Sequence, residues 1–482
     1  MTESDLKIIE GDEGSQISRH SNLNFLSFSM YQITWTFITA ALTLYLYFYY
    51  HAVLGLEPWM IFLAIALITV WDSLNEPLVG YLVDRNFKWT KKWGRRFPWM
   101  VIIFIPWCLS AYLLFSAPDI DVTTNSWPIF WWLVMSYAIF DICITIMDIN
   151  AGALRADKFR TEYERRKYAS YFGPLDMIAQ VIGMVVPGLF LGLSSGKAAY
   201  AIMGAMVAVV GIVFTILFLP GAREDKVIID RYFSKDYERI PFFKGIKEVI
   251  KQKSFLAFYI SYMTFTVATT LMTTMLIYLI TFILQVGPEM ESVLMAIFLI
   301  CAIASVPFWL KLVKKFNDTR KVYTIGGFAL CAALIPVTFF QTIVDLIIIF
   351  VILGFAIGCI WTLGVPVILS NVMDDYVVRT GKNQKGLVLG AWALVSRFSN
   401  FIDELLIMIV FGLTGFVAGV DTYVELVAAV DNVELALWGI RILIGLIPML
   451  IILCGALFFW KFYPLTQEKV LENKNKLKEL GF

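Results

Sequence analysis

Twelve apolar runs, each long enough to cross a lipid bilayer, divide this chain of 482 residues. A membrane-spanning helix needs about 20 mostly apolar residues, whereas the strands of a transmembrane β-barrel are short and alternate in polarity. The composition agrees, because 59% of the residues are hydrophobic, against about 45–50% in a typical soluble domain. We therefore predict an all-α, polytopic membrane protein. The runs are Phe25–Tyr50, Trp59–Asp84, Phe97–Ser116, Ile129–Arg155, Ala169–Leu193, Ala199–Pro220, Phe255–Gln285, Ser292–Phe316, Tyr323–Thr342, Leu346–Met373, Leu387–Val417 and Leu435–Phe462.

The longest hydrophilic stretch between these runs separates six predicted helices from six more. Similar segments, RADKFRTEYERRK and MDDYVVRTGKNQK, follow the fourth and the tenth run, which indicates a weak pseudo-repeat. Two such bundles with a binding site between them are typical of secondary transporters. We expect an N-terminal tail, a first bundle, a linker, a second bundle and a C-terminal tail, at residues 1–24, 25–220, 221–254, 255–462 and 463–482.

The distribution of basic residues predicts the orientation of the chain in the membrane. Lys and Arg gather in the loops after the second, fourth, eighth and tenth runs, whereas the alternate loops contain only Lys197 among several acids. Basic loops stay in the cytoplasm, so we expect both termini there, in a multi-pass protein of the plasma membrane. The formal net charge of +1 conceals this asymmetry, and the basic loops give no indication of nucleic-acid binding.

The cysteines and histidines argue against a redox, zinc or catalytic site. All six cysteines lie in apolar runs without a CxxC pair, and the only histidines are His20 and His51. Disulfides and zinc are therefore not expected. The sequence shows no Ser/His pair, metal-binding cluster or phosphate-binding loop, so we expect neither an enzyme nor a cofactor.

Two acids lie inside the second run, where a charged side chain is energetically costly. In WDSLNEPLVG, Asp72, Asn75 and Glu76 occupy positions i, i+3 and i+4 and share one helix face. Pro77 follows and leaves a backbone carbonyl without its helical partner. A carboxylate that faces lipid costs about 2.5–3.5 kcal/mol, so we expect these oxygens to face a hydrated cavity and to bind a small cation or a proton. The alternative is that both acids only form hydrogen bonds to neighbouring helices.

A second polar stripe lies in the fourth run. In DICITIMDIN, Asp141, Thr145 and Asp148 follow the spacing i, i+4, i+7 of one helix face. Thr145 could add a hydroxyl ligand to the cation site, and Asp148 is the better candidate to accept substrate hydroxyls or a cationic group. Asp141 and Asp176 are each either part of such a site or in a solvated or capping role.

A basic residue, Arg397, lies in the middle of the eleventh run. An arginine inside the membrane should pair with an acid, and the acids of the second and fourth runs are candidate partners that cation binding could rearrange. The alternative is a static salt bridge with Asp403 or Glu404. Trp361 and Trp392 are candidate walls of a substrate pocket.

These segments resemble the glycoside–pentoside–hexuronide:cation symporters of the major facilitator superfamily, which include the melibiose permease. The resemblance covers nearly the whole chain and is carried by WDSLNEPLVGYLVDR, KKWGRRFPW, ITIMDI, DKFRTEYERRKY and MDDY. It implies the major facilitator fold and a cation site formed by Asp72, Asn75, Glu76 and Thr145. Glu76 stands where the permease has Asp, which lengthens the carboxylate arm and bears on the choice among Na⁺, Li⁺ and H⁺.

The resemblance extends less completely to the sugar site. The permease's helix-one Asp falls at about Thr36, its helix-four Trp at Gly152 and its helix-five Arg near Gly173. An acceptor, a stacking ring and a cation are therefore missing, and relatives of this family also move lysophospholipids. The substrate-binding residues that the resemblance implies are Asp148, Arg397, Trp361, Thr36 and Gly152.

A cytoplasmic latch is predicted where the second run ends and the basic loop begins. We expect it to stabilise the outward-facing conformer. Its residues are Gly80, Asp84, Arg85, Gly94, Arg95 and Arg96.

We expect a cation-coupled symporter that moves a small solute by alternating access, with a sugar or glycoside favoured. The coupling ion, Na⁺ or H⁺ with Li⁺ as a further candidate, would neutralise the acids of the second run and so favour closure only when the solute is also bound. The alternative is an uncoupled facilitator, or a lysolipid or lipid transporter of the same fold, with structural acids. We expect a monomer whose only partners are the solute, the cation and the lipid bilayer, with no metal beyond Na⁺.

Overall fold

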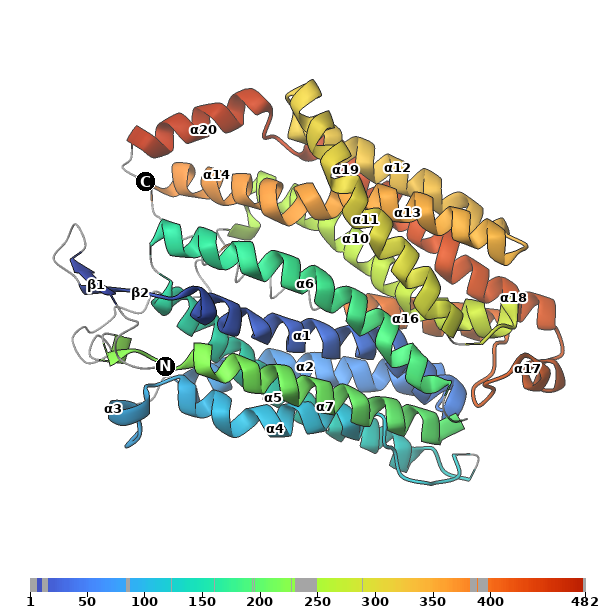
Figure 1. The fold of residues 1–482 in the computed structure, drawn as a ribbon. Coiled ribbons are helices and arrows are strands. Elements are labelled where there is room, and N and C mark those ends of the chain that lie inside the picture. The colour runs from blue at the N-terminus through green and yellow to red at the C-terminus, as the bar shows by residue number, and fades with distance from the viewer. Residues whose placement is uncertain are drawn as a thin grey trace. The chain divides into compact units, whose positions relative to one another are not determined.

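The structure is a computed structural model of residues 1–482 (Figure 1). The chain divides into two compact units, one comprising Met1–Leu56 and Leu63–Glu238 and the other Glu57–Phe62 and Arg239–Phe482. The five segments predicted from the sequence, two tails, two bundles and a linker, stay a prediction. The structure describes residues 7–10, 16–83, 87–122, 124–159, 161–192, 194, 196–226, 228–229, 249–287, 289–381, 388 and 398–479.

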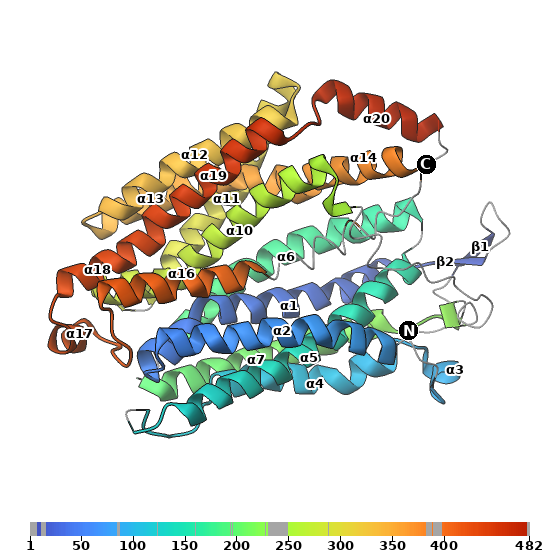
Figure 2. The ribbon, with the colours of Figure 1, turned by 180° about the vertical axis from the view of Figure 1, so that it is seen from behind.

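Long helices make up most of the described part of the first unit (Figure 2). They are α1 (Asn22–Phe48), α2 (Pro58–Val83, which belongs to this unit from Leu63 onward), α4 (Phe97–Leu114), α5 (Trp127–Lys158), α6 (Glu162–Leu191) and α7 (Gly196–Ala222). α1 continues into a π-helical turn, Tyr49–Val53, and the short α3 (Thr90–Trp93) precedes α4. α1 packs against α6 and α7, and α4 packs against α5 and α7.

Side-chain caps begin two of these helices at defined residues. The Ser21 Oγ accepts a hydrogen bond from the Asn24 N–H of α1 at 3.3 Å. The Thr161 Oγ1 accepts one from the Glu164 N–H of α6 at 3.2 Å. Each cap satisfies an amide that has no partner within its own helix, so the starts of α1 and α6 follow directly from the local sequence.

The described part of the second unit is also mostly helical. Its helices are α10 (Lys253–Tyr278), α11 (Glu289–Phe316), α12 (Thr319–Phe339), α13 (Ile343–Leu363), α14 (Ser370–Thr380), α16 (Phe398–Thr414), α17 (Tyr423–Ala429), α18 (Val433–Arg441), α19 (Ile447–Phe462) and α20 (Gln467–Glu479). π-helical segments extend α10, join α13 to α14 and join α18 to α19; they are Leu279–Leu284, Gly364–Leu369 and Ile442–Leu446. α11 packs against α13, and α10 and α12 both pack against α19.

Ten of the described helices are long and apolar enough to cross a membrane. The two predicted runs without such a helix, Phe25–Tyr50 and Leu387–Val417, contain α1 and α16. α1 has the necessary length, but its hydroxyl, amide and tyrosine side chains make it less apolar. α16 begins at Phe398, and residues 389–397 of that run lie outside the described part of the chain. The prediction of an all-α, polytopic membrane protein is confirmed.

Two short strands lie in the predicted N-terminal tail, where the sequence analysis expected none. β1 (Lys7–Glu10) and β2 (Gln16–Arg19) pair antiparallel, with Lys7 opposite Arg19 and Glu10 opposite Gln16. Their sequences, KIIE and QISR, do not show the strict alternation of polar and apolar residues by which a strand is recognised in a sequence. β2 ends one residue before His20, the residue that leads into α1.

A glycine lets α11 and α13 approach each other closely. A Cβ at Gly358 would overlap the Ser305 Oγ and lie 2.6 Å from the carbonyl oxygen of Ala302. Small residues permit such backbone approaches between membrane helices, where packing rather than the hydrophobic effect stabilises the contact.

Gly358→Ala should lower the apparent melting temperature of the purified protein, because the new methyl group meets backbone that cannot move aside. Overpacking of this kind costs about 1–3 kcal/mol. Gly412→Ala is the matched control, since a Cβ at Gly412 meets nothing within 4 Å. Equal melting temperatures for the two variants would contradict the close contact.

Candidate functional site

Asn75 joins α2 to α5 inside the first unit. Its Nδ2 donates hydrogen bonds to the Asp141 Oδ2 at 3.0 Å and to the Thr145 Oγ1 at 3.3 Å. These three side chains are buried. One turn further along, Val79 of α2 belongs to the same apolar cluster as Ile146 of α5. Because the amide nitrogen faces α5, the amide oxygen is the atom of Asn75 that a cation would bind.

Asp72 and Glu76 lie on the same stripe of α2 as Asn75. Both acids are half-buried. Leu74 and Leu78 lie on another face of the helix and are 58% and 64% exposed. α2 therefore turns its acids toward its more buried side and its leucines outward, the arrangement expected when lipid surrounds the helix.

Asp148 lies one turn beyond Thr145 on α5 and faces α1. The Tyr31 hydroxyl donates a hydrogen bond to its Oδ1, and the Trp35 Nε1 donates to its Oδ2 at 3.2 Å. Tyr31 and Trp35 are four residues apart, so one stripe of α1 supplies both donors. Asp148 is nevertheless exposed. A carboxylate held beside two aromatic rings is suited to a cationic group, which is attracted to both.

A second carboxylate, that of Asp176 on α6, faces the neighbouring stripe of α1. The Thr36 Oγ1 donates to the Asp176 Oδ1 at 2.6 Å, and the Gln32 Nε2 donates to the same oxygen at 2.9 Å. The Gln32 Nε2 also lies 3.0 Å from the Thr36 Oγ1. Thr36 stands at the position where the family resemblance expects an Asp on the first helix. Asp176 of α6 thus brings a carboxylate to this position.

The sequence analysis did not single out Tyr31, Gln32 or Trp35, and it left Asp141 and Asp176 undecided. A signal for the α1 residues was present, because Tyr31 and Trp35, like Gln32 and Thr36, are spaced by four and lie within an apolar run. Nothing local indicates which of the distant acids each pair would meet.

The other predicted substrate-binding residues are scattered over the chain. Gly152 lies one turn beyond Asp148 on α5, and a Cβ there would meet nothing within 4 Å. Trp361 lies on α13 in the second unit, where its ring contacts Phe298 edge-on at 6.2 Å. Arg397 and Trp392 lie outside the described residues.

The predicted latch residues fall into three groups. Gly80 lies on α2, and a Cβ there would meet nothing within 4 Å. Asp84 and Arg85 lie outside the described residues. The turn that leads into α4 contains Gly94, Arg95 and Arg96. Its backbone holds a carboxylate, a contact that the sequence analysis did not predict.

This turn holds the carboxylate of Glu224, which follows α7. Three successive amides, those of Arg95, Arg96 and Phe97, donate to its two oxygens at 3.1, 2.5 and 2.9 Å. Gly94 has φ = +92°, and a Cβ there would overlap the carboxylate, so the position requires glycine. The amides at the start of α4 also favour a negative charge. The turn therefore binds the end of α7 to the start of α4.

Within the described part of the chain, no three His, Cys, Asp or Glu side chains group together as a metal-binding cluster. A cation between α2 and α5 would therefore need more than carboxylates. The amide oxygen of Asn75 and the hydroxyl of Thr145 are the additional oxygen ligands that a hard cation accepts.

Comparison with known proteins identifies relatives over most of the chain. The family model described as MFS/sugar transport protein matches residues 27–467. The sodium-dependent lysophosphatidylcholine symporter 1 of Mus musculus is 23% identical over 93% of this chain and 86% of its own. The sphingosine-1-phosphate transporter MFSD2B of Xenopus tropicalis is 22% identical over 86% of this chain and 82% of its own.

A solved structure of similar fold is that of a bacterial homologue of the human lysosomal transporter Spinster, in an inward-facing conformation. It has a TM-score of 0.65 at 13% identity and covers 94% of this chain and 97% of its own. Such a likeness shows the fold alone. The predicted superfamily is confirmed, but the relatives named above are not melibiose permeases, and a resemblance to that protein in particular is not supported.

Glu224→Ala should lower the melting temperature of the purified protein, because it leaves buried amides of the Gly94–Phe97 turn without an acceptor. An unsatisfied buried donor costs about 1–3 kcal/mol. Glu479→Ala, at an exposed position near the end of α20, is the control and should leave stability unchanged. A loss of stability no larger than that of the control would contradict the role of Glu224.

Proposed function

The chain belongs to the MFS/sugar transport protein family, and on this premise we propose that it is a sodium-coupled symporter of a lysolipid. Family membership and the apolar helices make it a multi-pass membrane transporter rather than an enzyme. The plasma membrane as its location and the cytoplasmic position of both termini are part of the proposal, and both rest on the basic loops.

The observation that carries the proposal is the contact of Asn75 with Thr145. It brings the hydroxyl of α5 to the α2 stripe that bears Asp72 and Glu76, so two carboxylates, an amide oxygen and a hydroxyl are available to one small cation. Asp141, which the family resemblance does not include, accepts a hydrogen bond from the Asn75 Nδ2 and so orients the amide oxygen of Asn75. Sodium is preferred over a proton as the coupling ion because neutral oxygen ligands stabilise a metal cation and do not take up a proton.

Coupling would follow from the cost of an unneutralised acid in the membrane. Without a cation, closing the site around Asp72 and Glu76 removes negative charge from water and is unfavourable. A bound cation offsets this cost, and bound substrate adds contacts that favour the closed state. The two ligands then shift the same conformational equilibrium, which is the requirement for symport.

A lysolipid substrate is supported by chemistry around Asp148 and by the relatives. A choline headgroup carries a permanent positive charge, and the Asp148 carboxylate beside Tyr31 and Trp35 offers an anion and aromatic faces. The positions that would bind a sugar in melibiose permease are Thr36, Gly152 and Gly173 in this chain. We therefore prefer the lysolipid to the sugar or glycoside favoured from the sequence. The second candidate, a sugar, is favoured by the description of the matching family.

Asp72→Asn and Glu76→Gln should each abolish uptake driven by a sodium gradient in proteoliposomes, because each removes a charge that the cation requires. A lost contact worth about 1.4 kcal/mol weakens sodium binding tenfold. Asp141→Asn should raise the sodium concentration needed for half-maximal uptake. Uptake is measured with a sodium gradient, with a proton gradient and with neither.

Ser73→Ala is the matched control on α2, because the Ser73 hydroxyl is exposed and bonds only to the Thr69 carbonyl of its own helix at 2.9 Å. Accumulation that persists in both acid variants would refute sodium coupling through α2. An uncoupled facilitator would instead show equal uptake with and without a gradient in the unmodified protein.

Lysophosphatidylcholine should raise the melting temperature of the protein in lipid nanodiscs more in sodium chloride than in N-methylglucamine chloride, because a ligand that binds the folded state stabilises it. A lysophosphatidic acid of equal chain length tests the headgroup charge, and a galactoside tests the sugar candidate. Trp35→Leu should weaken the effect of lysophosphatidylcholine, whereas Trp131→Leu, at a half-exposed position on α5, should not. Sodium-dependent stabilisation by the galactoside alone would replace the lysolipid with a sugar.

A further inference from the structure

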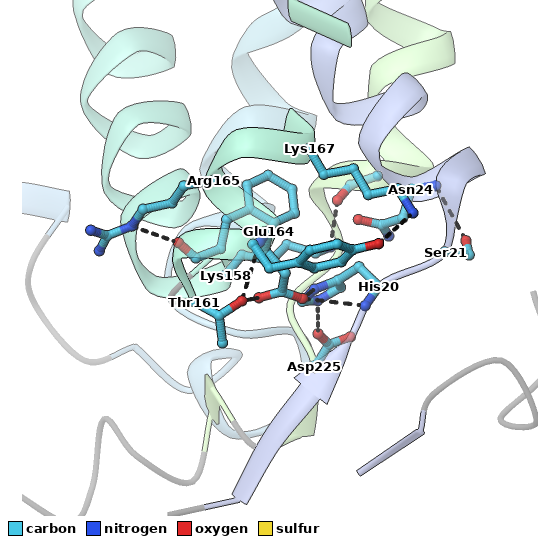
Figure 3. Close-up of polar contacts among 12 residues, drawn as sticks. His20, Ser21, Asn24, Lys158, Thr161, Glu164, Arg165, Lys167 and Asp225 are labelled. Atoms are coloured by element: carbon cyan, nitrogen blue, oxygen red, sulfur yellow. Dashed lines mark hydrogen bonds and ion pairs between the residues drawn. The ribbon is translucent and has the colours of Figure 1, made fainter. Parts of the chain in front are cut away.

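His20 lies between two carboxylates at one end of the first unit (Figure 3). Its Nδ1 is 2.9 Å from the Glu164 Oε1, and its Nε2 is 2.9 Å from the Asp225 Oδ2. The His20 backbone N–H also donates to the Glu164 Oε1 at 3.4 Å. The side chain of His20 is only 1% exposed. One imidazole thus connects the segment before α1, the first turn of α6 and the segment after α7.

The surroundings of this imidazole are closed and well defined. Phe25 of α1 and Phe159 at the end of α5 meet the ring edge-on, at centroid distances of 6.3 and 5.4 Å. Glu164 is held in place by Thr161, whose hydroxyl donates to its Oε2 at 3.3 Å. The ammonium of Lys158 lies close by and donates to the carbonyl of Gly221 in the last turn of α7 at 2.6 Å and to that of Arg223, just after α7, at 3.0 Å.

The geometry requires a particular protonation state. A neutral imidazole has one N–H donor and one acceptor nitrogen, whereas an imidazolium has two donors. Both ring nitrogens of His20 face carboxylate oxygens, which accept and do not donate when ionised, so both contacts form only in the cation. Burial by itself lowers the pKa of His20, but the hydrogen bonds to Asp225 and Glu164 outweigh it and raise the pKa above its usual value.

The charged groups that face His20 come from each element packed around it. α6 contributes Glu164, the segment after α7 contributes Asp225, and α5 contributes Lys158, whose positive charge opposes that of the imidazole. Burial lowers the pKa of Lys158 to about 8, although Asp225, Glu224 and Glu164 partly counteract this. Lys158 and His20 therefore both lose charge as the pH rises.

The second unit has a comparable junction without an ionisable base. Gln252, the residue before α10, donates through Nε2 to the Asp375 Oδ2 of α14 at 2.7 Å. Ser254 donates to the same oxygen at 2.7 Å, and Asn473 of α20 donates to the Asp375 Oδ1 at 3.2 Å. In both units, then, a residue just before the first long helix contacts an acid on a later helix. In the first unit His20 contacts Glu164 of α6, and in the second unit Gln252 contacts Asp375 of α14. Only in the first unit does that contact depend on a proton.

We propose that His20 is a proton-dependent clamp that fastens the start of α1 to α6 and to the beginning of the linker after α7. Protonated, it holds Glu164 and Asp225 together; deprotonated, it can donate to only one of them and releases the other. The chain enters α1 through His20 and leaves α7 through Asp225, so the clamp determines whether the segment before α1 is fastened to both Glu164 and Asp225. The proposal does not depend on which solute or ion is transported.

The direction of the pH effect follows from the raised pKa of His20. A base that binds its proton more tightly in the folded than in the unfolded state stabilises the fold fully below its unfolded pKa of about 6.5. That stabilisation is lost as the pH rises through the folded pKa. We therefore expect the clamp to be closed at acidic and near-neutral pH and to open on alkalinisation.

The protonation of His20 can be measured directly by nitrogen-15 NMR of the protein labelled at histidine and reconstituted in nanodiscs. The chain has two histidines, so the His20 signal is the one absent from the spectrum of His20→Gln and retained in that of His51→Gln. We expect both ring nitrogens to be protonated at pH 6.5, with a titration midpoint above that value. Glu164→Gln, which removes one carboxylate, should lower the midpoint.

The consequence for stability is measured by comparing unmodified protein with His20→Gln at each pH from 5.5 to 8. We expect the unmodified protein to melt at the higher temperature at the acidic end, and the difference to shrink toward zero as the pH rises. Gln252→Ala is the control in the second unit, and its difference from the unmodified protein should not vary with pH. A His20 midpoint at or below 6.5, or a difference that is constant across this range, would overturn the clamp.

Discussion

The cost of a polar side chain in an apolar, membrane-embedded bundle governs the arrangement of the first unit. Such a side chain must find a partner within the protein, because lipid offers none. Asn75 finds Asp141 and Thr145 on α5, Asp148 finds Tyr31 and Trp35 on α1, and Asp176 finds Thr36 there. The groups proposed to bind cation and substrate are therefore also the groups that connect α1, α2, α5 and α6.

The same constraint takes another form at the ends of the helices, where carboxylates fasten chain segments together. Glu224 is held by amides of the turn before α4, Glu164 and Asp225 by His20, and Asp375 by side-chain amides and a hydroxyl. Glu224 and Asp375 are held by groups that do not titrate near neutral pH, whereas Glu164 and Asp225 share the imidazole of His20. The imidazole is the one fastener among them whose hydrogen-bonding capacity changes within the physiological range.

The sequence predicted the helical fold and most of the spanning helices because run length and apolarity are local properties. It missed the short strands β1 and β2, whose residues do not alternate in polarity, and it ranked α1 with the other spans although α1 is less apolar. For the site, the spacing of Asp72, Asn75 and Glu76 correctly placed them on one helix face. The substrate class was harder to predict from the sequence. Thr36, Gly152 and Gly173 show which sugar-binding groups of the melibiose permease are absent, but they do not show what this chain binds instead.

By itself, the sequence determined the fold class, the polar stripes on individual helices and the residue types available to hold a cation. These follow from spacings of three, four and seven residues within one helix. Only the tertiary structure decided which stripes meet. The contacts of Asn75 with Asp141, of Trp35 with Asp148 and of His20 with Asp225 span 66, 113 and 205 positions, and no local pattern encodes a partner at such a distance, because it depends on how the helices pack.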